Sequence, residues 1–213
     1  MKVVGLWSGG KDSCFASYKA GSLGYDILAM FNFTTTDGRC SVSHGLTSEI
    51  IRKQAQASRM PIVQKAMPEE NYRQEFKNLI SAWRNERGIE GIVFGDIYLQ
   101  EHKDWIDKVC RELEVKAILP LWRRDTKELI LEIINAGFEA IVVSTRAELL
   151  GEEWLGRKID KEFIEELSSE IDPCGEKGEF HTFVYNGPIF KKPVDFVVGK
   201  KVHKGTHWFL ELK

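Results

Sequence analysis

The chain has 213 residues, of which 43% are hydrophobic and 29% charged, so it is long and apolar enough to bury a core and is not a disordered chain. Its 30 lysines and arginines against 32 aspartates and glutamates give a net charge of -2, which excludes a globally basic surface for nucleic acid. The four cysteines form no C-x-x-C pair, no stretch reaches the roughly 20 apolar residues of a membrane span, and no signal peptide is recognisable, so we expect a cytoplasmic protein without disulfides or a membrane partner.

The first half of the chain alternates short apolar runs with helical patterns. Strands are predicted at residues 3–7, 27–33, 62–63, 91–95 and 117–119. Helices are predicted at residues 11–23, about 47–58, from 72 to the stop at Gly88, and around 106–113. This alternation is typical of an α/β, Rossmann-like fold, with a parallel sheet and helices on both faces. Functional groups should then gather at the carboxyl ends of the strands.

The second half differs in pattern from the first. A helix is predicted from the capping box at Asp125 to Gly137, then a strand at 140–144 and a helix at about 161–171. From Thr182 onward, short β-runs separated by turn residues indicate antiparallel hairpins, with breaks at 186–188, 191–193, Gly199 and Gly205. We therefore expect two domains, residues 1–122 and a smaller α+β domain, residues 123–213.

A glycine-rich loop lies between the first predicted strand and helix, with the sequence Ser8-Gly9-Gly10-Lys11-Asp12-Ser13. Glycines let the backbone approach a ligand, and the free N–H groups of the first helical turn favour an anion, so the loop indicates a phosphate site. It is not the ordinary P-loop, because Asp12 occupies the place of the Mg²⁺-binding Ser or Thr. The structural alternative is a tight turn capped by Ser8.

This loop resembles the S-G-G-x-D-S loop of the PP-loop ATP pyrophosphatases, which cleave ATP to AMP and pyrophosphate. The resemblance implies that the β and γ phosphates are bound by Ser8, Gly9, Gly10, Asp12 and Ser13. Lys11 would add a point charge for the leaving pyrophosphate. Mg²⁺ is expected with ATP, since one lysine cannot compensate so many phosphate charges.

A second cluster of reactive residue types lies near the C-terminus. Residues 172–182 hold a thiol (Cys174), an imidazole (His181), several carboxylates and two glycines. On residue types alone, a hairpin lead-in with scattered charges would also explain it. The run D-x-C-G-E-x-G-E-F-H-T, continued through the Gly187-Pro188 pair to Phe190, resembles the C-terminal signature of the diphthine–ammonia ligases.

Further segments resemble that family, so the likeness covers nearly the whole chain: Gly95-Asp96-Ile97, Pro120-Leu121-Trp122 and Leu155-Gly156-Arg157-Lys158-Ile159-Asp160. One departure is the pair His102-Lys103 before Trp105, where His-Arg is expected, and it weakens any role for that basic side chain. The family implies ATP-dependent amidation by ammonia of diphthine, a modified histidine of translation elongation factor 2, through an acyl-adenylate. Because no cysteine lies in a recognisable glutaminase motif, we expect free ammonia to be the nitrogen source.

The expected site combines both clusters. Catalytic roles are assigned to Lys11, Asp12, Glu176, Glu179 and His181. Acceptor binding is assigned to Gly175, Glu176, Gly178, Glu179, His181 and Thr182. The carboxylates suit a quaternary ammonium or ammonium ion, and the ordinary pKa of a histidine, near 6.5, suits proton transfer by His181. Ligands for Mg²⁺ are left open.

Nucleotide binding is also assigned to Gly95, Asp96 and His44. Asp96 follows the fourth predicted strand, where α/β sheets bind nucleotides, although a helix cap would also explain it. His44 lies in a loop at the same edge and faces the nucleotide, the acceptor or solvent.

Other features leave alternatives open. A thiol pair of Cys40 and Cys174 would suit sulfur transfer, but their spacing does not make them partners. Lysines of the tail would suit docking onto a ribosomal factor or simply protect edge strands: Lys191, Lys192, Lys200, Lys201 and Lys204.

The competing functions are a PP-loop enzyme that modifies tRNA and a non-catalytic ATP-binding module. The lack of a broad basic surface argues against nucleic acid. The oligomeric state is left open, a homo-oligomer included.

Overall fold

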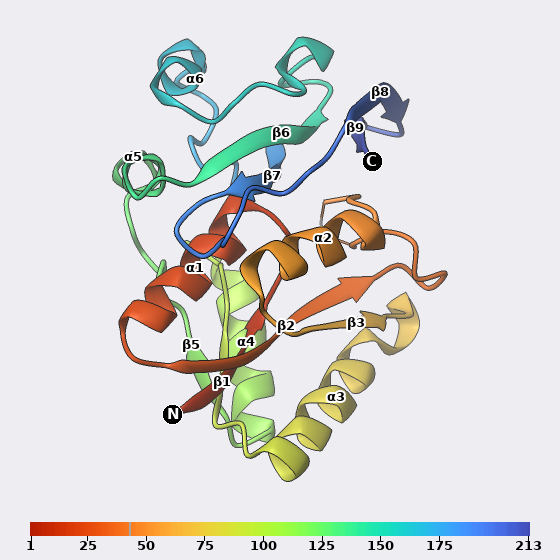
Figure 1. The fold of residues 1–213 in the computed structure, drawn as a ribbon, viewed down its shortest axis with the longest axis vertical. Helices are drawn as coiled ribbons and strands as arrows, with labels where there is room; N and C mark the ends of the chain where they lie inside the picture. Colours follow the sequence, from red (N-terminus) through yellow and green to blue (C-terminus); the bar gives the residue numbers. More distant parts are fainter. Residues whose placement is uncertain (43) are drawn as a thin grey trace.

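Five parallel strands form the sheet of the N-terminal half in a computed structural model that describes residues 1–42 and 44–213 (Figure 1). The spatial order is β3-β2-β1-β4-β5. The strands are β1 (Lys2–Leu6), β2 (Asp26–Thr34), β3 (Ile62–Ala66), β4 (Gly91–Val93) and β5 (Lys116–Ile118). Strand order reverses on the two sides of β1, so the carboxyl ends of β1, β2 and β4 border the crevice in which such sheets bind ligands.

Helices cover both faces of this sheet, because neighbouring residues of β1 point to opposite sides. Val3 belongs to one core with residues of α1 (Lys11–Ser22) and α2 (Ser48–Ser58). Val4 belongs to a second core with α3 (Tyr72–Arg87) and α4 (Gln100–Glu112). A short 3₁₀ turn, η1 (Glu69–Asn71), precedes α3. The predicted α/β class is confirmed.

A four-stranded antiparallel sheet forms the C-terminal half, in the order β7-β6-β9-β8. Its elements are α5 (Thr126–Asn135), β6 (Glu139–Arg146), η2 (Glu152–Trp154), α6 (Lys161–Glu166), β7 (Phe180–Asn186), β8 (Val198–Lys204) and β9 (His207–Leu212). The side chain of Asp125 accepts hydrogen bonds from the N–H groups of Lys127 and Glu128, as the capping pattern predicts.

Three predictions about this half were wrong in detail. The helix α6 ends at Glu166 and not near Ile171, because Leu167 is extended and a polar turn follows it. Gly199 lies inside β8 and is not a turn. The strand β7 pairs with β6, from which it is separated in sequence by η2 and α6. A hairpin is formed by β8 and β9, across the turn at Gly205.

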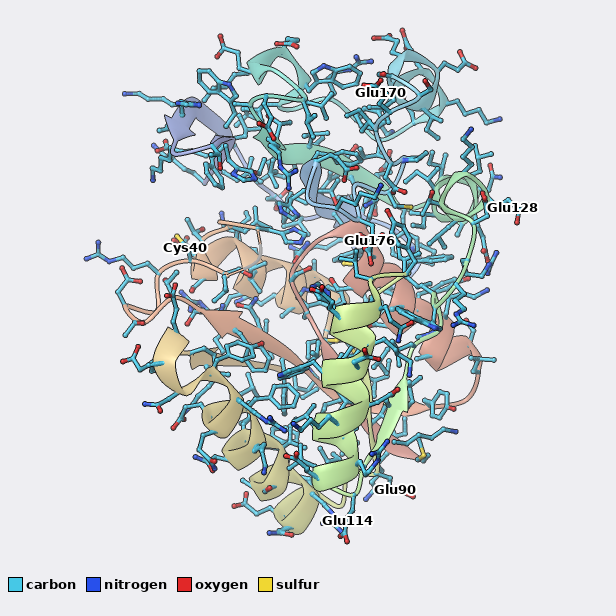
Figure 2. The ribbon with its side chains drawn as sticks, turned by 180° about the vertical axis from the view of Figure 1, so that it is seen from behind. Cys40, Glu90, Glu114, Glu128, Glu170 and Glu176 are labelled. Atoms are coloured by element: carbon cyan, nitrogen blue, oxygen red, sulfur yellow. The ribbon has the colours of Figure 1, made fainter. Side chains whose placement is uncertain are left out.

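One hydrophobic core joins the two halves. It contains Phe15 of α1 together with Phe183 of β7 and Val142 of β6, so the second sheet packs over α1 (Figure 1). Seen from behind, Glu176 lies at the junction of the halves (Figure 2). This packing places residues 172–182 over the amino end of α1. Among the described helices, none is long and apolar enough to cross a bilayer.

Candidate active site

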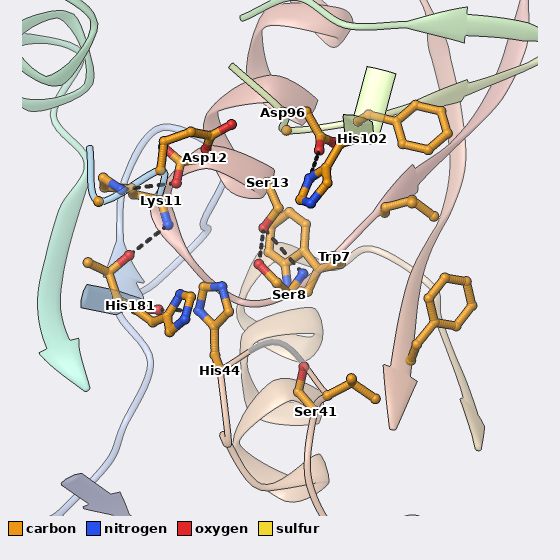
Figure 3. Close-up of a pocket in the computed structure, with 18 of the residues that line it drawn as sticks. Trp7, Ser8, Lys11, Asp12, Ser13, Ser41, His44, Asp96, His102 and His181 are labelled. Atoms are coloured by element: carbon orange, nitrogen blue, oxygen red, sulfur yellow. Dashed lines mark hydrogen bonds and ion pairs between the residues drawn. The ribbon is translucent and has the colours of Figure 1, made fainter. Parts of the chain in front are cut away.

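A cavity of about 300 Å³ opens at the carboxyl ends of β1, β2 and β4 and is closed by residues 174–182 (Figure 3). Its apolar lining includes Phe33, Val42, Tyr72, Phe94 and Leu99. Its polar lining includes Ser8, Lys11, Asp12, Ser13, Asp96, Glu176, His181 and Thr182. The structure thus brings the two clusters of the sequence into one site.

The loop at residues 8–13, called the phosphate loop below, is held in shape by its own serines. The Oγ atoms of Ser8 and Ser13 lie 3.1 Å apart, and the Gly10 N–H donates to Ser8 Oγ at 3.3 Å. Ser13 Oγ donates to the Gly10 carbonyl at 3.1 Å. Gly9 has a φ of 89°, in the left-handed region that favours glycine. The amino end of α1 therefore faces the cavity in a fixed conformation.

Gly95 is required by close packing against this loop. A Cβ at Gly95 would lie 2.9 Å from the backbone N of Ser13 and 3.0 Å from the carbonyl carbon of Asp12. Neither backbone atom can move without shifting the start of α1. Gly95 therefore sets how closely the segment after β4 approaches the phosphate loop.

Lys11 is buried, with 2% of its side chain exposed, and points away from the loop toward residues 172–182. Its ammonium group donates to Asp12 Oδ2 at 2.9 Å and to the Cys174 carbonyl, and lies 5.3 Å from the centre of the Phe180 ring. Burial opposes its charge, but the negative charges around it, Asp12 first, raise its pKa overall. Lys11 therefore stays charged and holds the cavity closed; its expected contact with phosphate stays a prediction.

Asp12 keeps one carboxylate oxygen without a protein partner. Oδ2 pairs with Lys11, whereas Oδ1 is buried and has no hydrogen-bond partner among the described residues. Burial raises the pKa of Asp12 against the opposing effect of the Lys11 charge. A buried, unpaired carboxylate oxygen is costly, so it indicates a place for a cation.

Glu176 also lines the cavity, next to the segment that follows β4. Its Oε1 accepts from the backbone N–H groups of Ile97 at 2.8 Å and Tyr98 at 3.4 Å. Burial raises its pKa to about 7, helped by the negative charges of Asp12 and Asp96. A carboxyl group with this pKa can accept or release a proton at neutral pH.

Glu179 does not line the cavity. Its side chain is buried, Oε1 accepts from the Asp172 N–H at 3.2 Å and Oε2 from the Lys177 N–H at 3.0 Å. Both oxygens therefore fix the turn that presents Glu176. Gly178 also lies outside the lining, whereas Gly175 belongs to it.

His44 and His181 lie side by side in the cavity, with ring centres 4.7 Å apart (Figure 3). His44 Nδ1 donates to the Thr182 carbonyl at 2.9 Å, which leaves Nε2 as an acceptor. Burial lowers the pKa of His44 to about 4 and that of His181 well below 6.5. The expectation of an ordinary histidine pKa for His181 was therefore wrong: both rings are neutral at pH 7.

Asp96 lines the cavity mouth and pairs with a residue that the sequence had not assigned to the site. Its Oδ1 lies 2.9 Å from Nδ1 of His102, which also lines the cavity (Figure 3). This hydrogen bond raises the pKa of His102. The predicted place of Asp96, at the crevice after β4, is where the structure puts it.

Comparison with known proteins identifies the family. The diphthamide synthase N-terminal domain model matches residues 1–117 and the diphthamide synthase C-terminal domain model matches residues 125–213. The chain belongs to the diphthamide synthase family. The boundary predicted at residue 122 stays a prediction.

Relatives of this diphthamide synthase family member are named diphthine–ammonia ligase. The Danio rerio protein is 28% identical over 91% of this chain and 86% of its own length, and the Homo sapiens protein 26% identical over 91% and 82%. The Schizosaccharomyces pombe protein is 27% identical over 91% of this chain, but the chain spans only 36% of that longer protein. The predicted enzyme class, a ligase that forms a carbon–nitrogen bond, is confirmed by these names.

A solved structure, of the predicted subunit of a tRNA methyltransferase from Methanocaldococcus jannaschii, is 13% identical. It matches 91% of this chain and 98% of that chain with a TM-score of 0.42. So distant a likeness gives no information about function.

Two buried polar residues near the phosphate loop of this diphthamide synthase family member, Gln54 and Asn32, were missed by the sequence reasoning. Gln54 is fully buried and donates to the carbonyls of Gly9, at 2.9 Å, and Val184, at 2.6 Å. Its Oε1 accepts from the Trp7 indole at 3.0 Å, and Asn32 donates to the Trp7 carbonyl at 2.8 Å. The available signal was a polar residue on the apolar face of a predicted helix or strand.

The cysteines do not form a reactive pair. Cys174 lines the site cavity, but burial raises its pKa, and its thiol donates to the Thr126 carbonyl at 3.4 Å. Cys40 lines a different cavity. Among the described residues, no group of three or more His, Cys, Asp or Glu side chains could hold a metal ion by itself.

Proposed function

We propose that the protein uses ATP to amidate diphthine on translation elongation factor 2 with ammonia. The diphthine carboxylate attacks the α-phosphorus of ATP, the bond to the β-phosphate breaks, and pyrophosphate leaves. Ammonia then attacks the acyl carbon of the adenylate, AMP leaves, and the nitrogen loses a proton. Family membership supports this reaction, and the chain would supply ATP binding through residues 1–122 and acceptor binding through residues 123–213.

The lining of the cavity offers groups for both parts of ATP. The rings of Phe33 and Tyr72, with centres 5.8 Å apart, suit a purine base. The phosphate loop at the amino end of α1 suits the phosphates. Asp96, which follows β4 and also lines the cavity, would contact the nucleotide.

The site also fits Mg²⁺ bound together with ATP. Magnesium typically takes one or two carboxylates, substrate phosphates and water, so a full protein cage is not required. Asp12 Oδ1, buried and unpaired, supplies a carboxylate oxygen beside the phosphate loop. The ion would neutralise phosphate charge during the departure of pyrophosphate.

Glu176 is the residue best suited to the amide-forming step. Its pKa of about 7 lets it take a proton from ammonium or from the attacking nitrogen at neutral pH. It lines the same cavity as the phosphate loop, where the acceptor carboxyl group would meet ATP. Glu179 would support this role indirectly, since it holds the backbone of Lys177 beside Glu176.

His44 and His181 would act without charge. Both rings are neutral at pH 7, so they can make hydrogen bonds to the acceptor or the α-phosphate but cannot compensate its charge. His181 would therefore orient the acceptor, and Thr182, which bonds the Lys11 N–H at 3.1 Å, would link it to the phosphate loop.

The observation that carries the proposal is the meeting of the phosphate loop and the 174–182 segment in one cavity. Pyrophosphate release should therefore depend on the acceptor. It should be measured with elongation factor 2 bearing diphthine, with the unmodified factor, and without ammonium. Release only with the diphthine-bearing factor is expected, whereas release that is the same with both factors would contradict the proposal.

A further inference from the structure

One face of the C-terminal sheet carries two rows of paired residues, the first of which starts in the candidate active site at His181 and leads away from it. The first row crosses all four strands through His181, Ser144, Phe209 and Val202. The second row, two residues further along β6, consists of Arg146, His207 and Lys204. Directly paired residues of an antiparallel sheet share a face, and so do residues two apart in a strand. All seven residues therefore lie on one face.

This face leads from the active site into a second cavity. His181 lines the first cavity, while Phe209, Val202 and Lys204 line a second one of about 560 Å³. The opposite wall is the loop that also carries His44: a Cβ at Gly45 would lie 3.1 Å from the Phe209 ring. The two cavities therefore adjoin where His44 and Gly45 meet the sheet.

The second row consists of basic residue types. The first row ends in the apolar residues Phe209 and Val202. Burial is the main cause that lowers the pKa of His181, and Arg146 and His207 lie close enough to His181 to contribute to it. The guanidinium of Arg146 also donates to the Lys177 carbonyl at 2.9 Å, so it is fixed in place. Glu211 is the acidic member of the described lining of the second cavity, opposed by Lys204 and Lys213. The surface thus combines an apolar floor with a mainly basic rim.

We propose that this face and the second cavity bind an acidic peptide segment of the acceptor protein. This inference rests on the proposed function and specifies the partner surface for it. Charge complementarity favours an acidic segment on the row of Arg146, His207 and Lys204. Continuity with the active site places the modified side chain of that segment past His181, toward the phosphate loop. The cavity volume of about 560 Å³ lies in the range of pockets that bury most of a drug-sized ligand, so part of a peptide segment fits into it.

The test compares Lys204→Glu with Lys192→Glu, which makes the same charge change at an exposed lysine outside the sheet face. Binding of the diphthine-bearing acceptor protein is measured by calorimetry at low and at physiological salt. Lys204→Glu should raise the Kd for the acceptor about tenfold at low salt, while Lys192→Glu should change it less than about twofold. Lys204→Arg, which keeps the positive charge, should bind the acceptor as the wild type does. The Kd for ATP should stay the same in all three variants.

Each other outcome overturns the inference. An unchanged acceptor Kd in Lys204→Glu, or equal weakening in Lys192→Glu, would show that the face is not the docking surface. A second copy of this chain or an RNA would be the occupant if Lys204→Glu abolished self-association or RNA binding and left acceptor binding intact. Acceptor binding that is too weak to measure in the wild type would overturn it as well.

Failure of the proposed function gives a different result. If the wild-type protein binds the acceptor through this face and forms no amide, the reaction is wrong and the docking surface stands. If it forms the amide and Lys204→Glu leaves the KM for the acceptor unchanged, only the docking surface is wrong.

Discussion

The side-chain ammonium of Lys11 donates a hydrogen bond to the backbone carbonyl of Cys174, a residue 163 positions later in the chain. Two further bonds run beside it: the Lys11 N–H donates to Thr182 Oγ1 at 3.1 Å, and the Val184 N–H donates to the Gly9 carbonyl at 3.0 Å. The phosphate loop and the segment that closes the cavity are therefore one structural unit. Changes at Lys11 should affect both.

Lys11→Ala should lower the rate of ATP cleavage by at least about tenfold, equivalent to about 1.4 kcal/mol. It should also lower the free energy of unfolding by about 1.5–3 kcal/mol, because the Cys174 carbonyl and the Asp12 carboxylate lose a charged donor. Chemical denaturation and steady-state kinetics measure the two effects. Lys19→Ala, which removes a half-exposed lysine from the same helix, is the control and should change stability by less than about 1 kcal/mol. Full activity in Lys11→Ala would refute the role of this contact.

Asp12→Asn should weaken ATP binding only when Mg²⁺ is present. The amide oxygen can still accept from Lys11, but the buried Oδ1 position loses the negative charge that suits the ion. Calorimetry with a non-hydrolysable ATP analogue, with Mg²⁺ and with a chelator, should show about a tenfold loss in the first condition only. Asp107→Asn, at a surface pair on α4, should leave both values unchanged. Equal losses in the two conditions would exclude Asp12 as a magnesium ligand.

The rate of amide formation should rise with pH through about 7. The raised pKa of Glu176 leaves it protonated below this value, so the base form needed to accept a proton appears only as pH increases. Glu176→Gln should remove this rise in rate. A second rise, at higher pH, should remain, because ammonium loses its proton there and becomes the nucleophile ammonia. Single-turnover rates at saturating ATP give the profile. A rise near pH 7 that persists in Glu176→Gln would assign it to another group.

Glu179→Gln and His181→Ala should differ in their effects. In Glu179→Gln, an NH₂ group replaces one of two oxygens that accept backbone N–H bonds, so the 172–179 turn should lose about 1–3 kcal/mol of stability. His181→Ala should leave the ATP affinity nearly unchanged and lower amide formation. Thermal unfolding and ATP calorimetry separate the two. Loss of ATP binding in His181→Ala as complete as in Lys11→Ala would place His181 on the nucleotide.

The architecture could be predicted from sequence because the patterns are local. The spacing of Phe76 and Ile80 on one helical face, the left-handed Gly88 that ends α3 and the cap at Asp125 each depend on a few neighbouring residues. The pairing of β7 with β6 could not be predicted, because it joins strands far apart in sequence. Strand alternation indicates which residues form a strand and not which partner it takes.

The site was predicted as a set of residues but not in its internal contacts. Local motifs pointed to Asp12, Glu176 and Asp96, and all three line the cavity. The turn of Glu179 away from the cavity depends on two backbone N–H groups, and the neutral state of His181 depends on burial between the two halves. Such properties follow from tertiary packing, which no motif contains.

Product analysis with isotope-labelled ammonium is the most direct test of the proposed reaction. The wild-type protein is incubated with ATP, Mg²⁺, the labelled ammonium and elongation factor 2 bearing diphthine. The nucleotide products are then separated and the factor is examined by mass spectrometry. We predict one AMP and one pyrophosphate for each labelled nitrogen found on the diphthine residue. Formation of ADP and phosphate, or cleavage to AMP without label on the factor, would contradict the account.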